Sequence, residues 1–197
     1  MKMKKDVKVI RDPKAIKVAV EDTRSNILSI LRINDMSISQ LAKSLDKDQS
    51  TIYRHIKKLE EYDYIEPTGE KKTHHIPEKI YGRTSGVFLL CPSNIDTGQP
   101  SEMMIEWERN KAERIIELLS IMGFDSDDGS ELIEDISDIF IDLKERVIKP
   151  IEESEEDIGK ISFATLLRLE LLMFLLELRN DQELREKVNT ALDKFTV

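Results

Sequence analysis

Two amphipathic segments separated by only three residues constrain the fold of this chain most strongly. Ser37 and Gln40 form a capping box, which predicts the start of a helix. Apolar residues at i, i+3, i+4 and i+7 run through Ile38–Leu45 and form its inner stripe. A second helix is predicted over Gln49–Tyr62, with Asp48 as its N-cap. Because so short a connection disfavours an antiparallel pair, we expect the two helices to cross steeply, in a helix-turn-helix.

The outward face of the second helix carries groups suited to DNA. Its inner stripe is Ile52, Ile56 and Leu59, and the opposite side holds hydroxyls, a guanidinium, ammonium groups and a phenol. Short polar side chains near the helix start suit base reading, and the basic ones further along suit phosphates. The alternative is a merely solvated face, since Lys and Arg lie outside in any case. The predicted DNA contacts on this helix are Gln49, Ser50, Thr51, Tyr53, Arg54, Lys57 and Lys58.

A basic hairpin is predicted directly after this helix. Residues Tyr64–Pro67 and Lys79–Thr84 are β-prone and flank the polar segment Thr68–Glu78, and Val87–Leu90 is a candidate extension of the second strand. Two strands in this position form a wing. We expect its Lys71, Lys72 and Arg83 to neutralise DNA phosphates.

Charge divides the chain into two halves. Residues 1–90 carry 18 basic and 13 acidic side chains, a net charge of +5, whereas residues 91–197 carry 12 and 26, a net charge of −14. We therefore expect a DNA-binding domain at residues 1–90, a linker at 91–100 that is rich in Pro, Ser and Asn, and an acidic all-α region at 101–197. The predicted fold class is mostly α with a small β wing: an N-terminal winged helix-turn-helix and a C-terminal helical dimerisation region.

The helix predicted over Ser162–Arg179 is apolar on nearly all sides. Such a helix must be covered all round in a soluble protein, and self-association is the simple remedy. We expect a homodimer formed through this region; the alternative is a monomeric bundle with the helix at its centre. Two further helices are expected before it. The first has an inward stripe that includes Met104, Ile115, Leu118 and Met122, and the second is stopped by Pro150.

The order and spacing of these motifs resemble the winged helix-turn-helix of ArsR-like transcriptional regulators. The resemblance rests on Asp22–Leu28, Ser37–Leu45, Ser50–Leu59 and Tyr64-Ile65, and Ile80–Thr84 resembles the second wing strand of an archaeal branch of that group. It covers about residues 10–90. It implies a dimeric regulator, here expected to be a repressor, that reads a palindromic operator. The positions it matches to base and backbone contacts are Gln49, Ser50, Tyr53 and Arg54.

Metal sensing through thiolates, which many ArsR-like regulators use, is not expected here. The segment Ser37–Leu45 contains no Cys or His, and Cys91 is the sole cysteine of the chain. We expect His55 to pack or to contact phosphate, and the adjacent His74 and His75 to lie at the wing tip rather than to chelate a metal. With neither a phosphate-binding glycine loop nor a nucleophile–base pair, we predict no enzyme activity, no metal and no cofactor.

The absence of a secretory signal and of a long apolar run predicts a soluble, cytoplasmic protein. Two alternatives to a plain DNA-binding regulator stay open. A winged helix also serves as a protein-interaction module without DNA contacts. A regulator with a small-molecule effector would need a pocket between the C-terminal helices; Trp107, Met122 and Phe140 could line one, although a hydrophobic core is the favoured reading of these residues.

Overall fold

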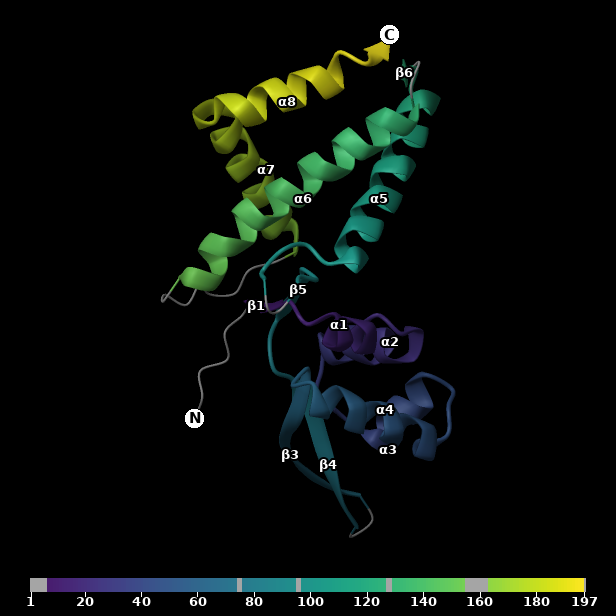
Figure 1. Ribbon diagram of the computed structural model, residues 1–197. Helices are drawn as coiled ribbons and strands as arrows, with labels where there is room; N and C mark the ends of the chain where they lie inside the picture. Colours follow the sequence, from purple (N-terminus) through teal and green to yellow (C-terminus); the bar gives the residue numbers. More distant parts are fainter. Residues whose placement is uncertain (1–6, 74–75, 95–96, 127–128, 155–162, 197) are drawn as a thin grey trace. The chain divides into compact units, whose positions relative to one another are not determined.

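The computed structural model describes residues 7–73, 76–94, 97–126, 129–154 and 163–196 (Figure 1). It is mostly helical with small sheets, so the predicted fold class, mostly α with a small β wing and a helical C-terminal region, is confirmed. The chain forms two compact units, which we describe separately. Unit 1 ends at Leu90, and unit 2 contains the described residues from Cys91 onward. None of the described helices is both long enough and apolar enough to span a membrane.

Unit 1 contains five strands and four helices among its described residues. In chain order they are β1 (Val7–Ile10), α1 (Pro13–Ala19), α2 (Asp22–Leu31), β2 (Met36–Ser37), α3 (Ile38–Ser44), α4 (Gln49–Glu61), β3 (Ile65–Thr73), β4 (Ile76–Arg83) and β5 (Val87–Leu90). The predicted caps of the helix-turn-helix are present. Ser37 and Gln40 bond reciprocally in a capping box, and the Asp48 carboxylate accepts from the backbone N–H of Thr51.

The core of unit 1 joins the inner stripes of its helices. The largest fully buried helical side chains are those of Ile16, Ile27, Leu41, Ile52, Ile56 and Leu59. Tyr64 closes this core, because its hydroxyl donates to the carbonyl of Ala15 at 3.0 Å and its ring meets that of Phe88 edge-on at 4.9 Å. Each such buried side chain contributes about 1.5–3 kcal/mol, so the inner stripe fixes which face of α4 remains open.

The wing is longer than the sequence predicts. Strands β3 and β4 pair antiparallel from Ile65 opposite Arg83 to Thr73 opposite Ile76, and β2 pairs with the other edge of β4. Much of the polar segment 68–78, which lies between the two predicted strands, is therefore itself strand, because the ladder satisfies its backbone groups. Pro67 is tolerated because β3 lies at the edge of this sheet.

Strand β5 does not extend the wing, contrary to the expectation for Val87–Leu90. It pairs in parallel with β1, with Val7 opposite Val87 and Ile10 opposite Leu90. The chain turns away from β4 at Ser85, whose hydroxyl donates to the carbonyl of Val87 at 3.0 Å. The short N-terminal strand is thus held in unit 1 by a partner about 80 residues away.

Unit 2 is helical, with one short two-stranded pair among its described residues. Its elements are α5 (Glu102–Ile121), β6 (Asp125–Ser126), α6 (Gly129–Glu153), α7 (Phe163–Asn180), α8 (Gln182–Leu192) and β7 (Phe195–Thr196), with β6 and β7 antiparallel. Its core cluster joins α6 to α8 through the buried side chains of Leu132, Ile139, Leu184, Val188 and Ala191. Within the segment expected as a linker, Cys91, Pro92 and Ser93 are buried, and Ser93 bridges to Pro100.

Two expectations for unit 2 are wrong. Pro150 was expected to stop α6 but lies inside it, and the helix runs on to Glu153. The helix ends one turn after the proline, where the backbone N–H of Ser154 still donates to the carbonyl of Pro150 at 3.0 Å. In α5 the inner face is Met104, Glu108 and Ala112, so Met104 faces inward as predicted, whereas the predicted stripe residues Ile115, Leu118 and Met122 are 39–72% exposed.

Candidate nucleic-acid interface

Helix α4 presents its polar side to solvent. Because Ile52, Ile56 and Leu59 are fully buried, the opposite side of the helix lies open. Arg54 and Lys57 on that side are exposed, and the ring of Tyr53 is 50% exposed. The described residues of unit 1 leave this face uncovered, as the sequence predicts for a helix that enters a groove.

Asp48 organises the start of this helix. Its carboxylate accepts from the hydroxyl of Ser50 at 2.5 Å, from the hydroxyl of Thr51 at 2.7 Å and from the backbone N–H of Thr51 at 2.9 Å. These hydrogen bonds, first that from Ser50 and then those from Thr51, hold the pKa of Asp48 well below its ordinary value. The side chains of Ser50 and Thr51, both predicted DNA contacts, are thereby each held in one rotamer without a ligand.

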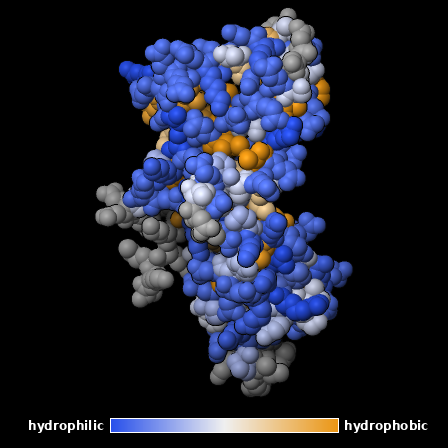
Figure 2. Space-filling view, in the orientation of Figure 1, coloured by the Kyte–Doolittle hydropathy of each residue, from blue (hydrophilic) through white to orange (hydrophobic). Residues whose placement is uncertain are grey.

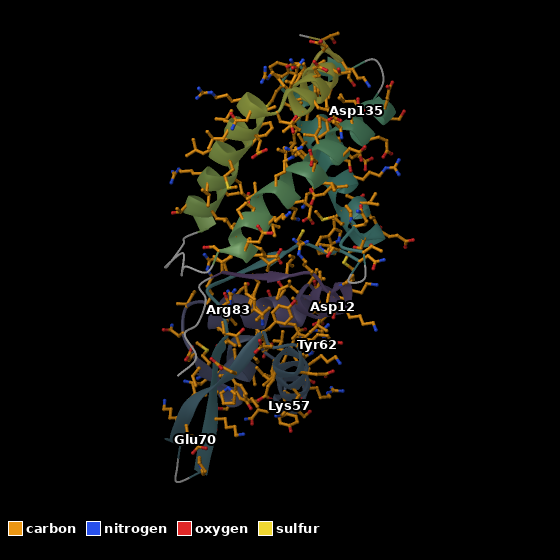
Figure 3. All side chains as sticks on the ribbon, turned by 60° about the vertical axis from the view of Figure 1, so that its left-hand side comes forward. Asp12, Lys57, Tyr62, Glu70, Arg83 and Asp135 are labelled. Carbon is orange, nitrogen blue, oxygen red and sulfur yellow. The ribbon has the colours of Figure 1, made fainter. Side chains whose placement is uncertain are left out.

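The basic side chains of α4 are held by neighbours on the same helix. Lys57 Nζ lies 2.7 Å from Glu60 Oε2 and 5.8 Å from the centre of the Tyr53 ring. The hydrogen bond to Glu60 raises the pKa of Lys57. Lys58 pairs in the same way with Glu61 at 2.9 Å and lies over Tyr62, which Figure 3 labels together with Lys57. Both ammonium groups are exposed enough to exchange these partners for phosphate oxygens at small cost.

A groove joins the start of α4 to the wing. It is open, has a volume of about 660 Å³, and runs between the first turns of α3 and α4 and strand β4. Four of the predicted contact residues meet in it, whereas Lys57 and Lys58 lie further along α4. The residues that line the groove are Ile38, Ser39, Gln49, Ser50, Tyr53, Arg54, Glu78 and Lys79.

Four of these lining residues are absent from the predicted DNA contacts: Ile38, Ser39, Glu78 and Lys79. The hydroxyl of Ser39 donates to Glu78 Oε2 at 2.7 Å, and hydrogen bonds from Ser39 and then Ser37 lower the pKa of Glu78. Lys79 follows Glu78 in β4 and is exposed. The basic Lys79 in a β-prone run after a helix-turn-helix was the one signal that could have pointed to this site.

The predicted wing contacts separate into two places. Lys71 is exposed and stands opposite Glu78 in the ladder, and Lys72 stands opposite Pro77, although the side chain of Lys72 lies outside the described part. His74 and His75 also lie outside the described residues. Arg83 is at the other end of the hairpin from Glu70, as Figure 3 shows. Its guanidinium carbon lies 4.6 Å from the centre of the Phe88 ring, so it does not join the α4 groove.

His55 forms part of the packing between α4 and α2. Its Nδ1 lies 3.6 Å from Glu21 Oε2, and its side chain is 19% exposed. Burial lowers the pKa of His55, and the Glu21 carboxylate offsets part of that effect. The packing role expected for this histidine therefore agrees with its position. In the described part of the chain, no three His, Cys, Asp or Glu side chains are grouped so as to hold a metal ion.

The comparisons with known proteins agree with this geometry. A family model described as the bacterial regulatory protein, arsR family, matches residues 21–66, which run from the N-cap of α2 through the helix-turn-helix into β3. The comparison with curated proteins returned no match for the chain. The matched segment contains α4 and its exposed polar face, and the family it matches is described as one of regulatory proteins. Residues 21–66 are accordingly an ArsR-family helix-turn-helix domain, the DNA-binding part of a transcriptional regulator.

Proposed function

We propose that this protein is a homodimeric repressor that reads a palindromic DNA operator through two copies of α4. The observation that carries the proposal is the open groove of unit 1, in which the first turn of α4 and strand β4 bring Gln49, Ser50, Tyr53 and Arg54 together on one exposed surface. Hydroxyl, amide and guanidinium groups can bond to base edges, and the nearby lysines can neutralise phosphates.

The roles of the individual residues follow from their positions. Gln49, Ser50, Thr51 and Tyr53, at the start of α4, read base edges in the major groove. Arg54, Lys57 and Lys58 further along the helix contact phosphates, as do Lys71 and Lys72 of the wing and Lys79, which this structure adds. Arg83 is not part of this surface, because it contacts Phe88 and stands opposite Ile65, at the end of the hairpin away from its tip.

Dimerisation is supported by the exposed leucines of α7. Five of them, Leu167, Leu171, Leu172, Leu175 and Leu176, are 50–59% exposed, and Figure 2 shows apolar side chains at the surface of unit 2. They expose roughly 500 Å² in one copy, so a symmetric pair would bury about 1,000 Å², the lower limit of a specific interface. A second copy that presents the same face satisfies both surfaces at once.

The assembly suits a palindrome. A two-fold dimer would present its two α4 helices to half-sites about 34 Å, one turn of B-DNA, or a multiple of that distance apart. The net charge of −14 on residues 91–197 would keep those residues away from DNA and orient the basic half toward it. Repression is the simpler outcome, because it needs only that the dimer occupy its operator, whereas activation needs a further contact with the transcription machinery.

Selection of bound duplexes from a random pool tests the proposal. The expected result is a palindromic consensus whose half-sites are one turn, or two, apart. Enrichment of a single asymmetric site would contradict the symmetric dimer, and no enrichment at all would contradict sequence-specific binding. Transcription from a promoter that carries the selected site should then fall when the protein is added; a rise would overturn the repressor assignment.

The alternative is a winged-helix protein-interaction module. The net charge of −9 and the engagement of Lys57 and Lys58 by Glu60 and Glu61 favour it. A gel shift against random duplex at low salt separates the two functions. A DNA-binding protein should retard the duplex with an affinity that falls steeply as salt rises, whereas an interaction module should leave its mobility unchanged.

A further inference from the structure

The α4 groove contains a carboxylate, that of Glu78, beside groups that we expect to meet DNA phosphates. Hydrogen bonds from Ser39 and then from Ser37 keep the pKa of Glu78 below its ordinary value, so the carboxylate is ionised at neutral pH. An anion on a surface that binds a polyanion lowers the affinity by charge alone, because it repels the phosphates. The place of Glu78 in this groove therefore calls for a role other than contact with phosphate.

Glu78 joins the wing to the helix-turn-helix. It lies on β4, and its Oε2 accepts from the hydroxyl of Ser39, in the first turn of α3, at 2.7 Å. The hydroxyls of Ser39 and Ser37 lie 2.9 Å apart. Ser37 is buried and caps α3 through its reciprocal bonds with Gln40, so this row of hydroxyls ends at a fixed point of the fold. The wing is thereby anchored to α3 through a side chain as well as through the β2–β4 ladder.

The anchor lies where the wing extends past β2. Strand β2 pairs with β4 as far as Ile80, whereas the ladder of β3 with β4 continues to Ile76, and Glu78 lies between these two points. Its neighbours on the hairpin are cations: Lys71 stands opposite it in the ladder, and Lys79 follows it in β4. A hydrogen bond at this point fixes both lysines with respect to α3 and, through the short turn that follows α3, with respect to α4.

We propose that Glu78 is a positioning residue for DNA: through Ser39 it holds the wing at the angle at which Lys71 and Lys79 reach the phosphates beside α4. The inference rests on the proposed function and adds to it a determinant of affinity that need not touch DNA itself. Without the anchor, the outer part of the hairpin would have to be ordered on binding, and that ordering weakens binding. Charge and position thus predict opposite effects for removal of Glu78: loss of the charge alone tightens binding, whereas loss of the anchor weakens it.

Fluorescence anisotropy of the full chain with a labelled duplex of random sequence tests this role, because phosphate contacts do not depend on sequence. At about 50 mM salt, Glu78→Ala should raise the Kd about fivefold, although it removes a negative charge. Glu70→Ala removes the same charge from an exposed position on β3, outside the groove lining (Figure 3), and should leave the Kd unchanged or lower it. A Kd for Glu78→Ala at or below that of the wild type would overturn the proposal, since charge would then account for the whole effect.

Two further variants separate the anchor from a general loss of structure. Glu78→Gln keeps an acceptor for the Ser39 hydroxyl and should bind within about twofold of the wild type. Ser39→Ala should weaken binding as Glu78→Ala does, and the double variant should bind no more weakly than either single variant, because both changes remove the same bond. Additive losses in the double variant, or a Glu78→Gln protein as weak as Glu78→Ala, would contradict the anchor.

The salt dependence gives a readout that a change in stability alone does not move. Glu78→Ala should reduce the slope of log Kd against log salt by about one for each lysine that loses its phosphate, whereas Glu70→Ala should keep the wild-type slope. An unchanged slope for Glu78→Ala would show that Lys71 and Lys79 do not depend on it. Failure of the wild type to bind the duplex would overturn the proposed function itself, whereas wild-type binding with no loss in Glu78→Ala would overturn this role alone.

Discussion

Single residues of α4 carry most of the proposed recognition, and Arg54 offers a direct test of it. Its Nη2 lies 3.3 Å from the hydroxyl of Thr51, so the side chain is directed along the open face of the helix. Arg54→Ala should weaken operator binding by about 1–3 kcal/mol, because a charge-assisted contact is lost. Fluorescence anisotropy at fixed ionic strength measures this. Lys43→Ala, exposed at the end of α3 and outside the groove, serves as the control, and an unchanged Kd for Arg54→Ala would remove α4 from the DNA.

Asp48 makes the stability of unit 1 depend on pH. Its pKa in the folded protein lies below the ordinary value of 3.8, so the folded state binds fewer protons than the unfolded chain. The stabilisation is therefore complete above that ordinary value and is lost as the pH falls from it toward the lower pKa of the folded state. Asp48→Asn keeps an acceptor for the helix cap but cannot titrate.

The measurement is urea unfolding between about pH 3 and 6. The wild-type protein should lose stability more steeply toward acid than Asp48→Asn, whereas Asp138→Asn, an exposed substitution on α6, should follow the wild-type curve. Parallel curves for wild type and Asp48→Asn would show that the hydrogen bonds from Ser50 and Thr51 do not persist in solution.

Among the helices and strands, one side chain of α6 forms ion pairs with both α7 and the N-cap of α8. Arg146 lies on α6 and contacts Asp142 at 3.1 Å, Glu177 of α7 at 2.9 Å and Asp181, the N-cap of α8, at 2.8 Å. Hydrogen bonds from the guanidinium, the one to Asp142 most of all, raise the pKa of Arg146 above its ordinary value. A network that joins three helices is worth more than an isolated surface pair.

Arg146→Met should lower the free energy of unfolding by about 1–2 kcal/mol, because three carboxylates lose a shared partner while the apolar stem is kept. Lys149→Met is the matched control, since Lys149 is exposed on the same helix and its distance to Glu153 is 3.9 Å. Denaturant unfolding followed by circular dichroism measures both. If the two variants lost the same stability, the network would have no special role.

The sequence predicts the helices of unit 1 well because their signals are local. The capping box at Ser37, the N-cap at Asp48 and the stripe from Ile52 to Leu59 each lie within a few residues of what they determine. The same reasoning failed where partners are distant. The parallel pairing of β5 with β1 cannot be read from Val87–Leu90 alone, and the contact of Ser39 with Glu78 spans 39 residues.

Helix α5 shows why its inner face was predicted correctly at Met104 but wrongly further along the helix. The expected stripe avoided Glu108, a charged residue, but this carboxylate is 4% exposed and accepts from Lys111 at 2.7 Å and from Lys144 of α6 at 3.2 Å. Lys144, which lies on another helix, therefore offsets part of the desolvation cost of burying the Glu108 carboxylate. Periodicity gives the width of an apolar stripe, but the partner helix decides which side of it turns inward.

At the scale of the whole molecule, the proposed dimer requires the leucine face of α7 to be covered. Leu172 is 59% exposed, so Leu172→Asp should leave the monomer folded and split the dimer. Sedimentation velocity should show a dimer for the wild type and a monomer for the variant. Ile33→Asp, which changes an 80% exposed apolar residue of unit 1, should remain dimeric. A folded, monomeric wild type would refute pairing through α7.

The parallel ladder between β1 and β5 has a mechanical consequence. Val7 and Leu90 lie at opposite ends of the paired strands, so tension that draws the chain away at these two points loads the ladder along its length. The strands must then slide past each other and give up their bonds together, rather than unzip one bond at a time. A force applied to the chain at residue 91 would thus be transmitted through the ladder to β1. From Ile10 it would pass through the short link to α1 before unit 1 began to unfold.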